Sequence, residues 1–132
     1  MKVFIDTSAF FALLDRDDQN HGSAKKSWIR LLDSNSLFIT SNYVILETFA
    51  LLQNRLGIVA ARGFQEDLMP ILHVEWVDSN IHNLAVSGLL AASKRKLSLV
   101  DCSSFEIIRR MSIKSVFAFD SHFRDQGFDC LP

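Results

Sequence analysis

The chain has 132 residues, of which 48% are hydrophobic, so residues 1–132 suit one compact domain with a buried core. Its net charge of −1 argues against a nucleic-acid binder that works through overall positive charge, although a local basic patch could still serve. No apolar run approaches the roughly 20 residues that span a bilayer, and the start Met1–Asp6 reaches a charge too early for a signal peptide. We therefore expect a soluble, cytoplasmic protein that does not act at a membrane.

Short apolar runs alternate with helical patterns along the whole chain. The first strand is predicted at Val3–Ile5 and the first helix at Thr7–Leu14. Further strands are predicted at Leu37–Thr40, Leu72–Val77 and Val116–Phe119, and further helices at Ala24–Leu32, Asn42–Leu56, Ile58 to about Met69, Ile81–Ser93 and Asp101–Met111, before a last short segment at Gly127–Leu131. Strands separated by helices form βαβ units, so the pattern predicts an α/β fold with a mostly parallel central sheet and helices on both faces.

Four carboxylates are placed where a parallel sheet would bring them together. Asp6 and Asp120 follow predicted strands, Glu47 lies in the apolar helix Asn42–Leu56, and Asp101 opens a later helix. Ligands of open α/β sheets bind outside the carboxyl ends of the strands. Buried carboxylates need partners because desolvation disfavours the charged form, and no cation in the sequence is placed to serve all four. A divalent metal would satisfy them together, which points to metal-assisted hydrolysis of a phosphodiester.

Each carboxylate also has a purely structural interpretation. Asp6 could be the N-cap of the helix that follows it, and Ser98–Asp101 fits the S-x-x-D capping pattern. Asp120 could open a turn. Glu47, whose helical neighbours are apolar, could pair with a lysine or arginine from elsewhere. These readings do not explain why all four acids point at one rim of the sheet.

The acids and their surroundings resemble the PIN domain, and in particular the VapC-type toxin ribonucleases of prokaryotic toxin–antitoxin pairs. The matching segments are Val3–Ser8, Ser41 with Leu46-Glu47, Leu97–Asp101 and Val116–Phe123, in that order along essentially the whole chain. The resemblance implies a PIN-like three-layer α/β/α sandwich. It also implies a catalytic, metal-binding cluster of Asp6, Glu47, Asp101 and Asp120, which holds one or two Mg²⁺ or Mn²⁺ ions, with Thr7 and Ser121 as supporting hydroxyls. Many relatives carry Thr or Ser where this chain has Ala118, a departure that would weaken a supporting contact.

Contacts to RNA are the least defined part of the prediction. An acidic site repels a phosphate backbone, so cations near its rim must counter it. Lys94, Arg95 and Lys96 precede Asp101 and are candidates, and His122, two residues after Asp120, is a possible substrate contact. No motif in the sequence specifies which RNA is cut.

Three other functions remain open at this stage. A haloacid-dehalogenase-type phosphatase also uses an aspartate after its first strand, but it expects D-x-D, and this chain has Ser8 at the second position. A non-catalytic interaction module would keep the fold with a silent site. A housekeeping RNA-processing nuclease would use the same acids without a toxin role.

Partners are predicted from apolar surface and from the resemblance. The helix Asn42–Leu56 is apolar on both faces, and Ile58–Ala61 with Phe64 and Leu68 adds apolar surface beside it, so we expect a homodimer. The VapC-type resemblance implies the same, and it also implies an antitoxin protein. Such an antitoxin would lie in the groove between these helices and place a basic side chain near Asp6 and Asp101.

Overall fold

The central sheet has five strands, all parallel, in the order β3-β2-β1-β4-β5. The computed structural model describes all residues from Met1 to Pro132. The strands are β1 (Lys2–Ile5), β2 (Leu37–Ser41), β3 (Leu72–Glu75), β4 (Ser115–Phe117) and β5 (Asp129–Leu131). The predicted α/β class with a mostly parallel sheet is confirmed. The last short segment of the chain is the edge strand β5, which pairs with β4.

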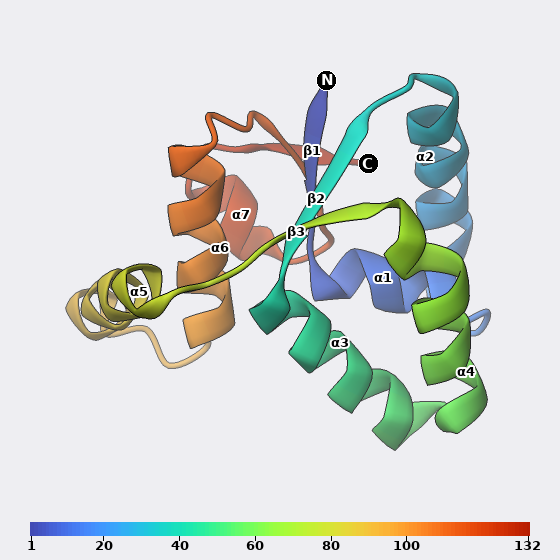
Figure 1. Ribbon diagram of the computed structural model, residues 1–132, viewed down its shortest axis with the longest axis horizontal. Helices are drawn as coiled ribbons and strands as arrows, with labels where there is room; N and C mark the ends of the chain where they lie inside the picture. The colour runs from blue at the N-terminus through green and yellow to red at the C-terminus, as the bar shows by residue number, and fades with distance from the viewer.

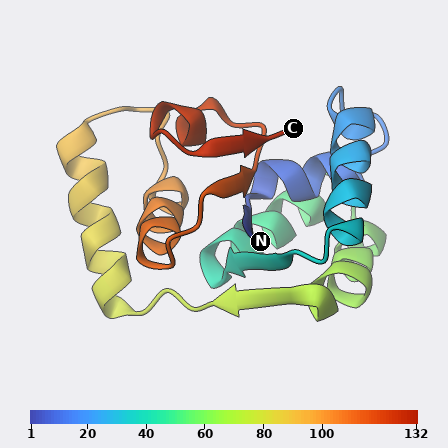
Figure 2. The ribbon, with the colours of Figure 1, turned by 90° about the horizontal axis from the view of Figure 1, so that it is seen from above.

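Helices lie on both sides of this sheet (Figures 1 and 2). They are α1 (Thr7–Leu14), α2 (His21–Asp33), α3 (Asn42–Arg55), α4 (Ile58–Gly63), α5 (Ser79–Ala92), α6 (Leu99–Arg110) and α7 (Ser121–Asp125). The helix predicted from Ile58 to Met69 is shorter, because it passes into the π-helical turn η1 (Phe64–Leu68) and the 3₁₀ turn η2 (Met69–Ile71). Pro70 lies in η2, where its missing N–H prevents continuation of an α-helix. No helix combines the length and apolar character that crossing a bilayer requires.

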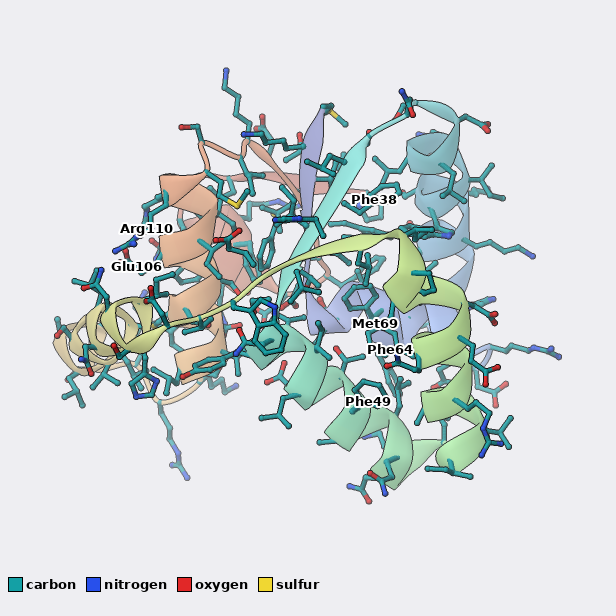
Figure 3. The ribbon with its side chains drawn as sticks, in the orientation of Figure 1. Phe38, Phe49, Phe64, Met69, Glu106 and Arg110 are labelled. Carbon is teal, nitrogen blue, oxygen red and sulfur yellow. The ribbon has the colours of Figure 1, made fainter.

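The core is built around β1, whose residues Val3, Phe4 and Ile5 are all fully buried. On one side of the sheet, Trp28 of α2 packs on Phe38 of β2, with ring centroids 4.8 Å apart. Phe64 of η1 packs edge-on against Phe49 of α3 at 5.2 Å (Figure 3). Because both faces of β1 are covered, its sequence is a continuous apolar run rather than an alternating one.

The strand order reverses between β1 and β4. Chain connections from β1 run outward to β2 and β3, and the chain then returns to the other side of β1 as β4 and β5. In open parallel sheets this reversal leaves a crevice at the carboxyl edge of the two central strands. Asp6 directly follows β1, and its N–H donates to the carbonyl of Phe117 at the end of β4 at 3.1 Å.

Two predicted strands end earlier than expected. β3 stops at Glu75, and the N–H of Val77 donates to the side chain of Asn42 at 2.6 Å instead of a neighbouring strand. β4 stops at Phe117, so Asp120 lies three residues beyond the strand and not at its end. A short loop, and not the strand itself, therefore sets the position of this carboxylate.

Candidate active site

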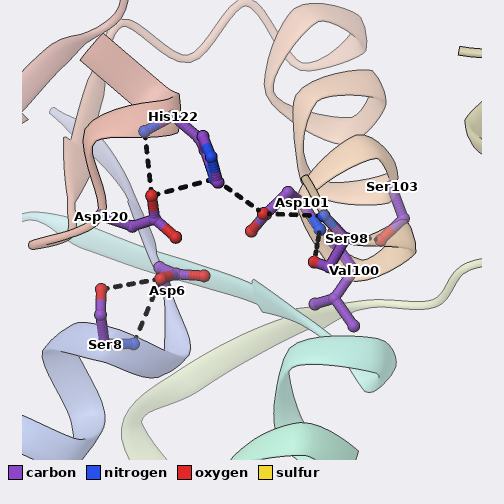
Figure 4. A network of polar contacts seen from close by, with 8 residues as sticks. All are labelled: Asp6, Ser8, Ser98, Val100, Asp101, Ser103, Asp120 and His122. Atoms are coloured by element: carbon purple, nitrogen blue, oxygen red, sulfur yellow. Dashed lines mark hydrogen bonds and ion pairs between the residues drawn. The ribbon is translucent and has the colours of Figure 1, made fainter. Parts of the chain in front are cut away.

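Asp6 occupies the turn between β1 and α1 (Figure 4). Its Oδ2 caps α1 by accepting the Ser8 backbone N–H at 3.2 Å and the Ser8 hydroxyl at 2.7 Å. Only 4% of Asp6 is exposed, and its Oδ1 is buried without a hydrogen-bond partner. Burial raises the pKa of Asp6 to about 7, the Ser8 hydrogen bonds lower it in part, and the charges of Asp101 and Glu47 raise it again. The cap takes one oxygen and leaves the other free for a ligand.

Asp101 is held in the first turn of α6 by a capping box. Its N–H donates to the Ser98 hydroxyl at 3.0 Å, and its Oδ2 accepts the Ser98 backbone N–H at 3.2 Å (Figure 4). Burial raises the pKa of Asp101, the Ser98 backbone lowers it, and the charge of Asp120 raises it. The capping interpretation is confirmed, and it fixes the carboxylate at the start of the helix.

Asp120 and His122 complete this side of the site. Asp120 caps α7, because its Oδ1 accepts the His122 backbone N–H at 2.9 Å. The His122 ring lies between two carboxylates, with Nδ1 3.0 Å from Asp120 Oδ1 and 3.2 Å from Asp101 Oδ2 (Figure 4). One potential ligand atom from each of Asp101, Asp120 and His122 lies within 4.8 Å of the others. A single cation could contact all three residues.

Glu47 approaches from α3 and is half-buried. Burial raises its pKa, the Thr7 hydroxyl lowers it, and the charges of Asp101 and Asp120 raise it, which places Glu47 among the other acids. Thr7 is buried, and it accepts a hydrogen bond from the Thr48 hydroxyl at 3.3 Å. This pair of buried hydroxyls links α1 to α3, and its α3 member, Thr48, is the residue that follows Glu47.

The donor set fits a hard divalent cation. Asp6 Oδ1, Asp101 Oδ1 and Asp120 Oδ2 accept no hydrogen bond from the protein, while the opposite oxygen of each carboxylate is held by a cap. No lysine or arginine forms an ion pair with these acids, whose only ion-pair partner is His122. A buried oxygen without a partner is uncommon in proteins, and carboxylate oxygens are the ligands that Mg²⁺ and Mn²⁺ prefer.

Ser8 joins the two segments that follow β1 and β4. Its hydroxyl donates to Asp6 Oδ2 at 2.7 Å and accepts the backbone N–H of Phe119 at 2.9 Å. The loop that carries Asp120 is thereby tied to the turn that carries Asp6. The sequence analysis named Ser8 as part of the segment Val3–Ser8 and as the residue that breaks a D-x-D pattern, but its bridging role depends on Phe119, 111 residues away.

Replacing Ser8 by alanine tests this bridge. We expect Ser8→Ala to lower the free energy of unfolding by about 1–3 kcal/mol. The Phe119 N–H would lose its acceptor, and Asp6 Oδ2 would lose one of its two hydrogen-bond donors. Chemical denaturation in metal-free buffer measures the change. Ser87→Ala, at an exposed position of α5, is the matched control and should change the value by no more than about 0.5 kcal/mol.

The other predicted site residues differ in solvent exposure. Ser121 is exposed, and no hydrogen bond joins its hydroxyl to the acids, so its supporting role stays a prediction. Lys94, Arg95 and Lys96 are all exposed in the link between α5 and α6, shortly before the Ser98 cap. Ala118 is 5% exposed and brings no hydroxyl to the site.

A parallel α/β sheet with clustered carboxylates at its topological switch point is typical of enzymes that bind a divalent metal and act on phosphate esters, among them metal-dependent nucleases. Within that class the chain belongs to the PIN domain family, whose sequence profile matches residues 3–129. It is 35% identical over 129 residues to the 23S rRNA-specific endonuclease VapC20 of Mycobacterium tuberculosis, in strains CDC 1551 and H37Rv. The match covers 96% of this chain and 95% of the relative.

Solved structures agree with this assignment. The crystal structure of Mycobacterium tuberculosis VapC20, described as a Sarcin-Ricin loop cleaving toxin, has a TM-score of 0.84 at 35% identity, covering 96% of this chain and 95% of that one. FitAcB from Neisseria gonorrhoeae has a TM-score of 0.67 at 14% identity, over 98% and 96% of the two chains, and shows the fold alone. The predicted family, its nuclease class and the PIN-like sandwich are confirmed.

Proposed function

We propose that this protein is a metal-dependent endoribonuclease and the toxin of a type II toxin–antitoxin pair. The observation that carries the proposal is the acid cluster at the switch point, where capped carboxylates keep free oxygens and no lysine or arginine pairs with them. The 35% identity to a 23S rRNA-specific endonuclease over nearly the whole chain supports RNA as the substrate and makes 23S rRNA the first one to test.

Asp6, Glu47, Asp101 and Asp120 are the residues that would hold one or two Mg²⁺ or Mn²⁺ ions. When bound, such an ion supplies Lewis-acid activation of water and of the phosphodiester. The chain itself supplies rigidity, because helix caps fix Asp6, Asp101 and Asp120 before any ligand arrives. Burial of Asp6 and Asp101 excludes water from the site and strengthens its electrostatic interactions.

RNA must reach this acidic site past its own charge repulsion. Lys94, Arg95 and Lys96 are exposed within a few residues of the Ser98 cap, where they can neutralise phosphates on either side of the cleaved bond. His122 is less free to contact RNA, because its ring lies against Asp101 and Asp120. We therefore assign RNA binding to Lys94, Arg95 and Lys96. To His122 we assign the orientation of the Asp101 and Asp120 carboxylates.

Cleavage of defined RNAs tests the proposed function. Purified protein with Mg²⁺ or Mn²⁺ should cut a 23S rRNA fragment containing the sarcin–ricin loop, and EDTA should abolish the cutting. Transfer RNA and messenger RNA fragments serve as comparison substrates. If no RNA is cut under any divalent metal, the chain is a non-catalytic PIN module and the enzymatic proposal fails.

An antitoxin is the proposed regulator. The sequence placed the antitoxin groove between α3 and the segment Ile58–Leu68, whereas a groove of about 530 Å³ lies between α1, α2 and η1, with apolar walls from Leu13, Trp28 and Leu68 and basic edges from Arg16 and Lys25. It can seat the apolar side chains of a helix or extended segment, whose arginine would then pair with the carboxylates in place of the metal. Overproducing the chain alone should arrest its host; harmless overproduction would favour a housekeeping RNA-processing nuclease.

A homodimer is proposed from the apolar residues that stay exposed. Leu46 of α3 is 71% exposed, and Ile58 and Val59 of α4 are 59% and 76% exposed. Phe64 and Leu68, by contrast, are core residues at 0% and 8% exposure and are not available to a partner. The exposed apolar surface of these segments is therefore smaller than the sequence pattern suggests, and we propose the outer sides of α3 and α4, around Leu46, Ile58 and Val59, as the partner surface.

Sedimentation of the wild type and of Val59→Asp tests the dimer. We expect the wild type to sediment as a dimer at tens of micromolar, and Val59→Asp to sediment as a monomer because it buries an unpaired charge in the interface. The exposed position makes loss of the fold by this substitution unexpected. Leu90→Asp, on α5 and 71% exposed, is the matched control and should leave the dimer intact. A wild-type protein of 15.0 kDa would contradict the proposal.

A further inference from the structure

A cavity of about 320 Å³ opens beside the acid cluster, on the side of α7 and β5. Asp120 forms part of its wall, so the cavity and the proposed active site share a residue. The remaining lining that matters here is Phe119, Ser121 and Arg124 from the Asp120 loop and α7, Ser23 from α2, and Ala118. Cys130 and Pro132 at the C-terminal end also line the cavity, and Figure 2 shows that the chain ends on the side of β5 that faces α2.

The lining of the cavity combines aromatic, hydroxyl and cationic side chains. Phe119 supplies an aromatic ring, Ser23 and Ser121 supply hydroxyls, and Arg124 supplies the only cation. Arg124 forms no ion pair with any carboxylate of the protein. Burial raises the pKa of the Cys130 thiol and the charge of Arg124 partly lowers it, which places the guanidinium close to this wall of the cavity.

Aromatic rings, guanidinium planes and hydroxyls are the groups with which proteins bind bases that have left the stack of an RNA strand. A volume of about 320 Å³ is at the small end of the range of roughly 300–1,000 Å³ for ligand sites. It suits a single planar group and not a base pair. Ala118 keeps the space open, because a larger side chain at this buried position would extend into the lining.

We propose that this cavity binds one unstacked nucleobase, that of a nucleotide adjoining the cleaved phosphodiester, with Phe119 stacking on the base and Arg124 contacting the same nucleotide. The inference rests on the proposed ribonuclease function and adds to it a base-binding subsite. Its position next to Asp120 means that filling the cavity places the neighbouring phosphate at the carboxylates. The cavity would thereby select RNA loops in which one base is free to turn outward.

The test combines abasic RNAs with cavity variants. A cleavable hairpin is made in versions that each lack one base near the cleaved bond, and binding is measured by fluorescence anisotropy with Ca²⁺ alongside kcat/KM with Mg²⁺. In the wild type, one abasic position should weaken binding roughly tenfold to a hundredfold, the range for one lost stacking contact. In Phe119→Leu, which removes the stacking ring, and in Ala118→Leu, the same abasic position should change binding by no more than about twofold, whereas Arg124→Ala should weaken binding of the intact hairpin.

Two matched controls keep this test specific. Arg110→Ala removes an exposed arginine at the opposite end of α6 from Asp101 (Figure 3), and Ala91→Leu enlarges an exposed alanine of α5. Both should keep the full abasic penalty. Circular dichroism and Tm show whether Ala118→Leu folds; if it does not, Phe119→Leu carries the test.

The outcomes separate the subsite from the enzyme. If Phe119→Leu and Ala118→Leu both keep the full abasic penalty, no base stacks in the cavity and the subsite is overturned. If the wild type cuts RNA in a metal-dependent way but no abasic position matters, the subsite fails and the ribonuclease function stands. If the wild type neither binds nor cuts RNA, the proposed function itself fails.

Discussion

Replacing any one of the four carboxylates by its amide should lower the rate of RNA cleavage by about a hundredfold or more while leaving the fold intact. The variants are Asp6→Asn, Glu47→Gln, Asp101→Asn and Asp120→Asn. Each amide keeps the shape of the side chain and can still accept the capping hydrogen bond, but it removes the negative charge that holds a divalent cation. Cleavage of a labelled RNA with Mg²⁺ or Mn²⁺ measures the effect, and titration with Mn²⁺ should show the accompanying loss of metal affinity.

Two acids outside the cluster serve as controls. Glu106→Gln, on the part of α6 beyond the site, and Asp125→Asn, at the exposed end of α7, remove the same charge without touching the four carboxylates. Both should retain cleavage within a few-fold of the wild type. Equal cleavage by the wild type and all four cluster variants would identify a contaminating nuclease as the source of the activity.

The metal-free protein should become less stable as the pH rises from about 4 to about 7. The folded protein keeps the Asp6 proton up to about pH 7, whereas the unfolded chain releases it near the usual value of 3.8. Between those values the folded state binds more protons, so the free energy of unfolding falls as the pH rises. A difference of about three pKa units corresponds to on the order of 4 kcal/mol. Burial raises the pKa of Glu47 and Asp101 as well, which acts in the same direction.

Asp6→Asn provides the decisive comparison for this pH effect. The amide cannot titrate, so its unfolding free energy should vary less between pH 4 and pH 8 and should exceed that of the wild type at pH 8 without metal. Adding Mn²⁺ at pH 8 should raise the Tm of the wild type much more than that of Asp6→Asn, because the ion binds only the folded site. Thermal denaturation across this pH range, with EDTA or with Mn²⁺, measures both effects. If the unfolding free energy of the wild type in EDTA does not change with pH, Asp6 is not a buried carboxyl group with a raised pKa.

The structural and the chemical interpretations of the acids are compatible. Asp6, Asp101 and Asp120 are all helix N-caps or capping-box partners. The local sequence predicted this for Asp6 and Asp101, whereas for Asp120 it predicted only a turn. A carboxylate has two oxygens, and in each of these residues one is held by backbone N–H groups while the other stays free. The caps hold the proposed ligands in fixed positions. The N-terminal ends of α1, α6 and α7, whose backbone N–H groups carry partial positive charge, also partly offset the repulsion between the acids.

The local sequence determined most of the architecture, because the signals are short-range. The apolar run Val3–Ile5, the Ser41 cap and the Ser98–Asp101 capping box all act over a few residues, and the structure shows them as predicted. The sequence also singled out the four acids, through their order along the chain, and their role as metal ligands is the part that we propose. The boundaries of β4 and of the helix after Ile58 did not follow from it, because tertiary hydrogen bonds and a proline set them.

Only the tertiary structure decided how these pieces meet. The reversal of strand order that puts Asp6 beside the Asp120 loop depends on pairings between β1 and β4, more than 100 residues apart. The Ser8 bridge to Phe119, the His122 ring between Asp101 and Asp120, and the cavity beside Asp120 all join segments whose distance in space no local pattern encodes. Local propensity fixes which residues form a strand, a helix or a cap, whereas the position of a side chain across the sheet depends on packing of the whole core.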